Sequence, residues 1–153
     1  MILYPGSNIE IDEINLQKSK PFKDFGRAFY LSDNFAQAKE MADYKCYLLG
    51  GNPIVTQFEY TENPDMRFLS FTGYTKEWAE FIFLNRDIDN TSAHNYDIVY
   101  GPIANDKVGA QIVNYKDGYI DFNEFLNRLK FFKGITYQYA FCTEESLKTL
   151  RKV

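Results

Sequence analysis

Two short strand-and-turn units near the start of the chain place the strongest limit on how it can fold. The first ends in YPGSN at residues 4–8, and the second is DFGRAFYLS at residues 24–32. Alternation over residues 28–31 predicts a strand, and each unit sets small, backbone-exposing residues beside a tyrosine or serine. Together they predict a slot for a flat polar ligand, with backbone hydrogen-bonding groups on one side and an aromatic wall on the other.

The remaining patterns alternate between strand and helix. Strands are predicted at residues 2–4, 28–31, 54–60, 67–71, 96–100 and 137–142. Helices are predicted from a cap at Ser32 or Asp33 to about Tyr47, after Thr75, after Asp121, and after Thr143 with Leu147 and Leu150 buried. Residues 111–115 fit either structure, and we expect a helix. This mixture predicts an α+β fold with a twisted, largely antiparallel sheet, in a single domain over residues 1–153.

Composition narrows the class of partner. The chain has 14 Phe and 12 Tyr, and tyrosine tolerates a wet edge, so we expect aromatic side chains along clefts as well as in the core. Its 21 Asp and Glu outnumber 17 Lys and Arg, giving a net charge of −4 and arguing against a nucleic-acid partner. The densest basic group, Arg128, Lys130 and Lys133, is expected to be the solvated side of a helix.

The number and positions of the cysteine and histidine residues argue against several kinds of site. Cys46 and Cys142 lie in a helical and a strand pattern, so we expect small buried thiols of a reducing compartment. The only histidine, His94, lies in a polar loop and is expected to be exposed, which argues against a zinc site and predicts no metal. The first residues do not resemble a signal peptide and no window suits a membrane span, so we expect a cytoplasmic protein.

Four runs, in this order, resemble domain-of-unknown-function family 3990, small bacterial proteins related to the ADP-ribosyltransferases. They are LYPGS at residues 3–7, DFGRAFYLS at 24–32 leading into Gln37-Ala38, YDIVYGPIAND at 96–106, and QYAFCTE at 138–144. The resemblance covers nearly the whole chain. It implies an ADP-ribosyltransferase-like fold, a split mixed or antiparallel β-sheet core with flanking helices, and a cleft that holds NAD as the substrate.

The resemblance also implies roles for particular residues. A His-Tyr-Glu triad in related proteins maps onto Pro5, Tyr30 and Gln138, which makes Tyr30 and Gln138 the expected catalytic residues. The expected cofactor-binding residues are Tyr4, Pro5, Gly6, Ser7, Gly26, Arg27, Phe29, Tyr30, Asn105 and Asp106. Gly6 would let the nicotinamide amide approach the backbone. Tyr30 would stack on the nicotinamide ring, although a core tyrosine with a satisfied hydroxyl fits its pattern as well. Asn105 and Asp106 would rim the cleft or simply close a turn.

Two departures leave the activity open. Pro5 replaces a histidine and has neither a side-chain donor nor an N–H. Gln138 accepts and donates hydrogen bonds but is no base, and a missing general base lowers a rate by about 10²–10⁴. One hypothesis is an enzyme that cleaves the nicotinamide–ribose bond and transfers ADP-ribose to an acceptor, such as a protein. The alternatives are a catalytically inactive module that binds ADP-ribose or a protein, and an unrelated aromatic-rich interaction module.

Overall fold

The structure is a computed structural model that describes residues 1–131 and 134–153. The strands are β1 (Ile2–Leu3), β2 (Gly6–Ser7), β3 (Phe29–Leu31), β4 (Ile54–Val55), β5 (Phe58–Tyr60), β6 (Phe68–Ser70), β7 (Ile98–Pro102), β8 (Tyr137–Phe141) and β9 (Leu150–Lys152). The helices are α1 (Phe35–Leu49), α2 (Lys76–Arg86), α3 (Val108–Lys116), α4 (Phe122–Leu129) and α5 (Glu144–Leu147), with a short 3-10 turn at Leu16–Lys18. The chain is therefore a mixed α/β protein.

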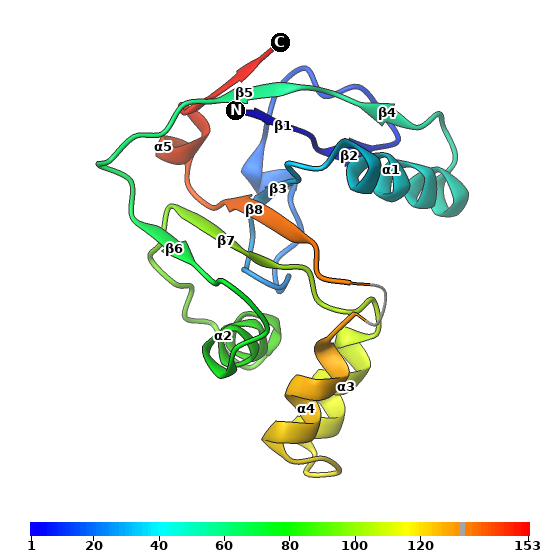
Figure 1. Cartoon of the computed structure of the whole chain (residues 1–153), viewed down its shortest axis with the longest axis vertical. Helices are drawn as coiled ribbons and strands as arrows, with labels where there is room; N and C mark the ends of the chain where they lie inside the picture. Colours follow the sequence, from blue (N-terminus) through cyan, green and yellow to red (C-terminus); the bar gives the residue numbers. More distant parts are fainter. Residues whose placement is uncertain (132–133) are drawn as a thin grey trace.

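The strands are divided among separate sheets (Figure 1). One sheet has the order β3-β8-β7-β6, with β6 parallel to β7 and the other neighbours antiparallel. A second sheet, β1-β5-β9, and the pair β2-β4 are antiparallel. A bridge joins the first two sheets, because Tyr4 N–H donates to the Ser32 carbonyl at 2.8 Å and Ser32 N–H donates back at 2.9 Å. The bridge brings the two N-terminal motifs side by side.

Two hydrophobic clusters cover opposite faces of the β3-β8-β7-β6 sheet. Neighbouring residues of a strand point to opposite faces. Val99 accordingly belongs to the cluster that includes α2 and α4, whereas Ile98 belongs to the cluster shared with β1 and β5. Trp78 of α2 is fully buried in the first cluster, and its indole N–H donates to the Pro102 carbonyl at 2.9 Å. The helices α2, α3 and α4 thus lie on one side of the sheet (Figure 1).

Helix α1 lies against β2 and β4, away from the other helices (Figure 1). The approach is close at Gly6, where an added Cβ would lie 2.4 Å from the Ala38 carbonyl oxygen and 2.9 Å from the Met41 Cβ. Glycine is therefore required here because backbone meets backbone, rather than because of an unusual φ angle. The contact fixes how far α1 stands from the first motif.

Several local predictions are confirmed and others are wrong. Thr75, Asp121 and Thr143 cap helices as expected, and residues 111–115 are helical. Helix α1 begins after Asn34, whose side chain accepts from Gln37 N–H, rather than after Ser32 or Asp33. The last helix ends at Leu147, and Leu150 lies in β9 because that segment pairs with β5.

The expected single strand over residues 54–60 is two strands, because the chain changes sheets. β4 pairs with β2, whereas β5 pairs with β1 and β9. The alternation itself is correct, since Thr56, Phe58 and Tyr60 are all buried. Arg128, Lys130 and Lys133 were expected to form a solvated basic surface. Arg128 pairs with Glu124 on α4, and Lys133 lies outside the described residues.

The expectation of an exposed His94 is wrong. The side chain is partly buried, and its Nδ1 accepts a hydrogen bond from Tyr96 N–H at 3.1 Å. Because Nδ1 is an acceptor, Nε2 carries the proton and donates to the Phe25 carbonyl at 2.7 Å. The neutral ring therefore connects the loop before β7 to the second motif.

We expect the free energy of unfolding to fall as the pH is lowered from about 7 to about 5. Burial lowers the pKa of His94 in the folded protein, whereas an unfolded histidine has a pKa of about 6.5. The unfolded state therefore binds the proton more readily. The contribution of neutral His94 is complete above about pH 6.5 and is lost as the pH falls towards the folded-state pKa.

Urea denaturation across this pH range measures the effect. His94 is the single histidine of the chain, so the variant His94→Gln is expected to show a flatter profile between about pH 7 and 5, whatever its absolute stability. An equal slope in the variant and the wild type would contradict this assignment.

Candidate functional site

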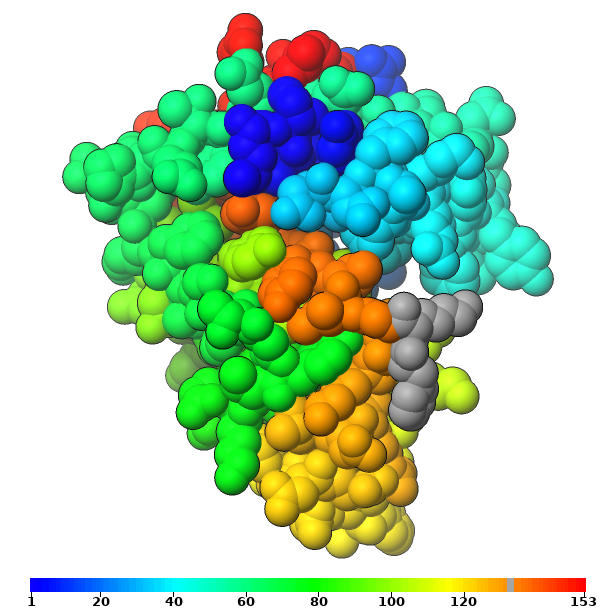
Figure 2. All heavy atoms as spheres, in the orientation of Figure 1, coloured from blue at the N-terminus to red at the C-terminus, as the bar shows by residue number. Residues whose placement is uncertain are grey.

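A cleft of about 350 Å³ lies where the two N-terminal motifs meet β8 and the loop after β7. The space-filling view shows the surface hollowed between cyan α1 and orange β8 (Figure 2). Its size falls within the range of about 300–1,000 Å³ that is typical of small-molecule sites. The lining residues are Tyr4, Gly6, Lys23, Asp24, Tyr30, Leu31, Ser32, Gln37, Ala38, Met41, Lys45, Arg86, Ile103, Ala104, Asn105, Asp106, Val108, Phe131 and Gln138.

All four sequence motifs contribute to this cleft. Tyr4 and Gly6 come from the first motif, Tyr30 from the second, Asn105 and Asp106 from the third and Gln138 from the fourth. In the sheet, Tyr30 is paired with Ala140 and Gln138 with Gly101, so Tyr30 and Gln138 share one face two residues apart. Both partners lie against the core, because Ala140 is fully buried and a Cβ at Gly101 would lie 3.1 Å from the rings of Phe25 and Phe71.

Other expected site residues do not line the cleft. Pro5 and Ser7 are buried, and the Ser7 hydroxyl accepts from Ile9 N–H. Arg27 donates to the carbonyls of Gln17 and Ser19 and so ties down the preceding 3-10 turn. Phe29 points to the opposite face of β3, where its ring lies 5.6 Å from that of Phe58.

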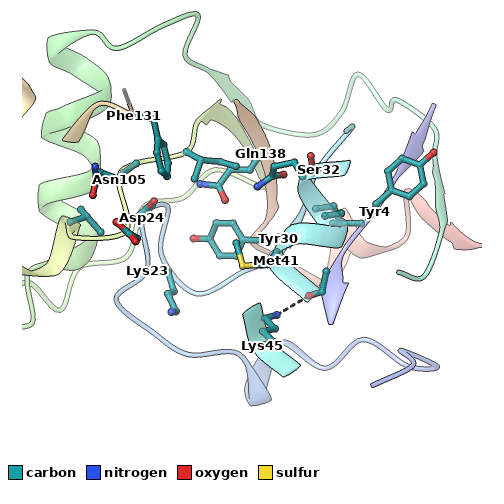
Figure 3. A pocket seen from close by; sticks show the side chains of 18 of the residues that line it. Tyr4, Lys23, Asp24, Tyr30, Ser32, Met41, Lys45, Asn105, Phe131 and Gln138 are labelled. Atoms are coloured by element: carbon teal, nitrogen blue, oxygen red, sulfur yellow. Dashed lines mark hydrogen bonds between the residues drawn. The ribbon is translucent and has the colours of Figure 1, made fainter. Parts of the chain in front are cut away.

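The Tyr30 hydroxyl holds the loop before β3 in place. It donates to the Gly26 carbonyl at 2.7 Å and accepts from Phe25 N–H at 2.9 Å. Burial raises the pKa of Tyr30 well above its ordinary value and the charge of Asp24 raises it further, so the hydroxyl stays protonated. Gly26 has a φ angle of 87°, which permits this turn. The ring remains at the centre of the cleft (Figure 3).

Replacing Tyr30 with phenylalanine is expected to lower the free energy of unfolding by about 1–3 kcal/mol. The variant Tyr30→Phe keeps the ring but leaves Phe25 N–H without its acceptor. Urea denaturation measures the change. The matched control is Tyr119→Phe, because Tyr119 is 79% exposed and an exposed substitution changes stability by at most about 0.5 kcal/mol. Equal losses in the two variants would contradict the bracing role of Tyr30.

Charged residues that the motifs do not single out also line the cleft. Arg86, at the end of α2, donates to the Asp24 carboxylate at 2.7 Å, and both side chains are largely buried. Lys45 of α1 donates to the Gly6 carbonyl at 2.9 Å. Desolvation lowers the pKa of Lys45, and the nearby ammonium groups of Lys23 and Lys20 lower it further. The basic part of the cleft contrasts with the net charge of −4.

Part of this set has a signal in the sequence. Gln37, Met41 and Lys45 are spaced by four residues and so lie on one face of α1. Gln37 comes shortly after the second motif. The helix face that starts at Gln37 also carries Lys45, so the sequence could have indicated Lys45 as a site residue. Arg86 has no such signal, because it meets Asp24 from 62 positions away.

The cleft also offers amide groups to a ligand. Within the described part of the chain, the Gln138 side chain has no hydrogen-bond partner, and it is only partly buried. The Asn105 side chain accepts from Lys107 N–H at 2.9 Å, so this residue both closes a turn and faces the cleft. Figure 3 shows Tyr30 between Gln138 on one side and Lys23, Met41 and Lys45 on the other. The amides of Gln138 and Asn105 and the ammonium groups of Lys23 and Lys45 thus line the same cleft, together with the carboxylates of Asp24 and Asp106.

Neither Cys46 nor Cys142 is among the residues that line this cleft. Cys46 and Cys142 are free thiols and only partly buried, whereas the sequence predicted small buried thiols. Burial raises the pKa of the Cys142 thiol to about 12, so it stays protonated near neutral pH. The Cys142 thiol lies 3.9 Å from the Phe25 carbonyl oxygen, which also accepts from His94 Nε2. The described residues also contain no cluster of His, Cys, Asp or Glu suited to a metal ion.

The fold and the cleft define a mixed α/β protein whose candidate site is a charged cavity at the junction of its sheets. Residues 1–152 match one family model, described as "Protein of unknown function (DUF3990)". The chain belongs to the DUF3990 family, as its motifs predicted. Comparisons with curated proteins and with solved structures give no match. Among the described residues, no helix has the length and apolar character needed to cross a membrane.

Proposed function

We propose that this protein is an NAD-dependent ADP-ribosyltransferase-like enzyme. It would cleave the nicotinamide–ribose bond of NAD and transfer ADP-ribose to an acceptor, for example a protein. The observation that supports this proposal best is that Gly6, Tyr30 and Gln138, from three separate motifs, line one cleft. The reaction passes through an oxocarbenium-like state, so the protein must mainly position the two halves of NAD.

In this proposal, Tyr30 and Gln138 act directly on the nicotinamide riboside end. The Tyr30 ring stacks on the nicotinamide, an arrangement that contributes about 0.5–1.5 kcal/mol beyond burial. The Gln138 amide hydrogen-bonds the ribose beside the breaking bond. Ser32 and Asn105 also line the cleft and offer further polar contacts. The ADP-ribosyltransferase-like fold and NAD as the substrate are part of the same proposal.

The test is an assay for the release of nicotinamide from NAD, in which chromatography measures the nicotinamide formed. Wild-type protein is expected to release nicotinamide above the uncatalysed rate, and Gln138→Ala is expected to lower that rate by about tenfold, the loss of roughly one hydrogen bond in the transition state. Gln57→Ala is the matched control, because Gln57 is exposed and lies outside the cleft. The proposal fails if wild type gives no release, or if Gln138→Ala and Gln57→Ala have equal rates.

A catalytically inactive nucleotide-binding module is the second candidate. This candidate is favoured by how the carboxylates of the described cleft are placed, because a general base must be free to act on the ligand. These carboxylates are Asp24 and Asp106. Asp24 is held by Arg86, and Asp106 lies in the exposed turn after β7. Glu144 and Glu145 belong to α5 and do not line the cleft. Binding of ADP-ribose without any release of nicotinamide would establish this second function.

A further inference from the structure

The cationic side of the cleft is assembled from two segments that are far apart in sequence. Lys23 lies in the loop before β3, and Lys45 lies on the third turn of α1. Both line the same cleft, and in Figure 3 they lie on the same side of Tyr30. Gly6 fixes the position of Lys45 by accepting its hydrogen bond at 2.9 Å. One ammonium group is therefore held in place before any ligand arrives.

The positive charge of this pair is not neutralised within the described residues. Neither Lys23 nor Lys45 takes part in an ion pair there, whereas Lys39, Lys116, Lys148 and Lys152 do. The neighbouring anion, Asp24, is already engaged by Arg86. Desolvation, Arg86 and Lys20 lower the pKa of Lys23, although the charge of Asp24 raises it, and desolvation together with Lys23 lowers the pKa of Lys45. Burial is the largest cause of both shifts and repulsion among the cations adds to it, so an anionic ligand beside the two lysines would favour their charged form.

The chemistry of the two lysines selects the kind of anion. An ammonium group is a compact charge with three donors, and it suits phosphate oxygens. The opposite side of the cleft offers the flat ring of Tyr30 and the neutral amide of Gln138. A ligand that satisfies both sides carries a planar polar ring at one end and phosphate groups at the other.

We propose that Lys23 and Lys45 form a phosphate-binding subsite that takes the diphosphate of a nucleotide and leaves its flat ring to Tyr30 and Gln138. The placement of the ring rests on the proposed function, whereas the phosphate subsite rests on the two lysines alone. Arg27, the cation expected from the motif, does not take this role because it is engaged by Gln17 and Ser19.

The test is calorimetric binding of inorganic pyrophosphate, ADP-ribose and nicotinamide riboside. The variants are Lys23→Met, Lys45→Met and the double variant, which keep the side-chain length and remove the charge. Each single variant is expected to weaken binding of pyrophosphate and ADP-ribose by about tenfold, and the double variant by about 100-fold. Binding of nicotinamide riboside, which has no phosphate, is expected to change by less than about twofold.

The matched control is Lys39→Met. Lys39 also lies on α1, but it is exposed and pairs with Asp43 outside the cleft. This control should leave all three affinities unchanged. Lys45→Arg, which restores the charge, is expected to recover most of the affinity for pyrophosphate. Lys23 is exposed, so Lys23→Met provides a test even if Lys45→Met does not fold.

Two results would overturn the subsite. One is wild-type protein that binds neither pyrophosphate nor ADP-ribose, and the other is equal affinity for them in wild type and Lys23→Met. Failure of the proposed function is distinguishable from either result. Binding that depends on the lysines, without release of nicotinamide, would contradict the proposed enzyme and support the subsite. Release of nicotinamide that is unaffected by the lysine variants would support the enzyme and contradict the subsite.

Discussion

The variant Gly6→Ala is expected to lose about 3 kcal/mol of its free energy of unfolding, the upper part of the range for overpacking. The new Cβ would lie 2.4 Å from the Ala38 carbonyl oxygen and 3.0 Å from the Ala42 backbone nitrogen. Because both atoms belong to the backbone of α1, rotation of a side chain cannot relieve the clash, and the helix must move away from β2.

Movement of α1 would also damage the cleft. The helix contributes Gln37, Met41 and Lys45 to its lining, and the Lys45 ammonium donates to Gly6 itself. We therefore expect Gly6→Ala to lose most of its affinity for ADP-ribose and pyrophosphate. Urea denaturation and calorimetry measure the two effects.

Gly109→Ala makes the same chemical change, but it is not expected to lower the free energy of unfolding. Gly109 lies in α3, and an added Cβ there would meet nothing within 4 Å. Alanine is favoured over glycine in a helix by up to about 1 kcal/mol, so this control is expected to be as stable as the wild type or more stable. A Gly6→Ala variant with wild-type stability would show that α1 does not approach β2 as closely as described.

The variant Gln138→Glu is expected to raise the rate of nicotinamide release by about 10²–10⁴, the usual contribution of a general base. This prediction rests on the proposed function. Glutamate has nearly the same shape as glutamine, and residue 138 lines the cleft. Lys23 and Lys45 line the same cleft and favour the ionised carboxylate.

Nicotinamide release by the purified variant measures this gain. Gln57→Glu is the control, since it adds the same charge at an exposed position outside the cleft. A gain in Gln138→Glu alone is the expected result. Equal rates in Gln138→Glu, Gln57→Glu and wild type would mean that residue 138 does not lie beside the reacting bond.

The sequence was sufficient to predict several of the residues that line the candidate cleft. Strand alternation placed Tyr30 on one face with Ala28, and Gln138 on one face with Ala140. The sheet pairs Tyr30 with Ala140, so these faces are the same face of one sheet. The prediction worked because the pleat of a strand determines side-chain direction locally.

Roles based on motif position alone were less reliable. Gly6 was expected to make room for a ligand, but its missing side chain makes room for α1. Arg27 and Phe29 lie within the second motif yet point away from the cleft, towards the 3-10 turn and Phe58. Neighbours in a strand face opposite sides, so only alternate residues of a motif reach the same site.

By itself, the sequence determined the local elements, their caps and the residues that share a strand face, because backbone sterics and side-chain spacing act over a few residues. Only the tertiary structure decided which segments meet. It divided residues 54–60 between two sheets, and it brought Arg86 to Asp24 and Lys45 to Gly6. These contacts depend on how helices and sheets pack together, and no local pattern records the partner of a side chain that lies tens of residues away.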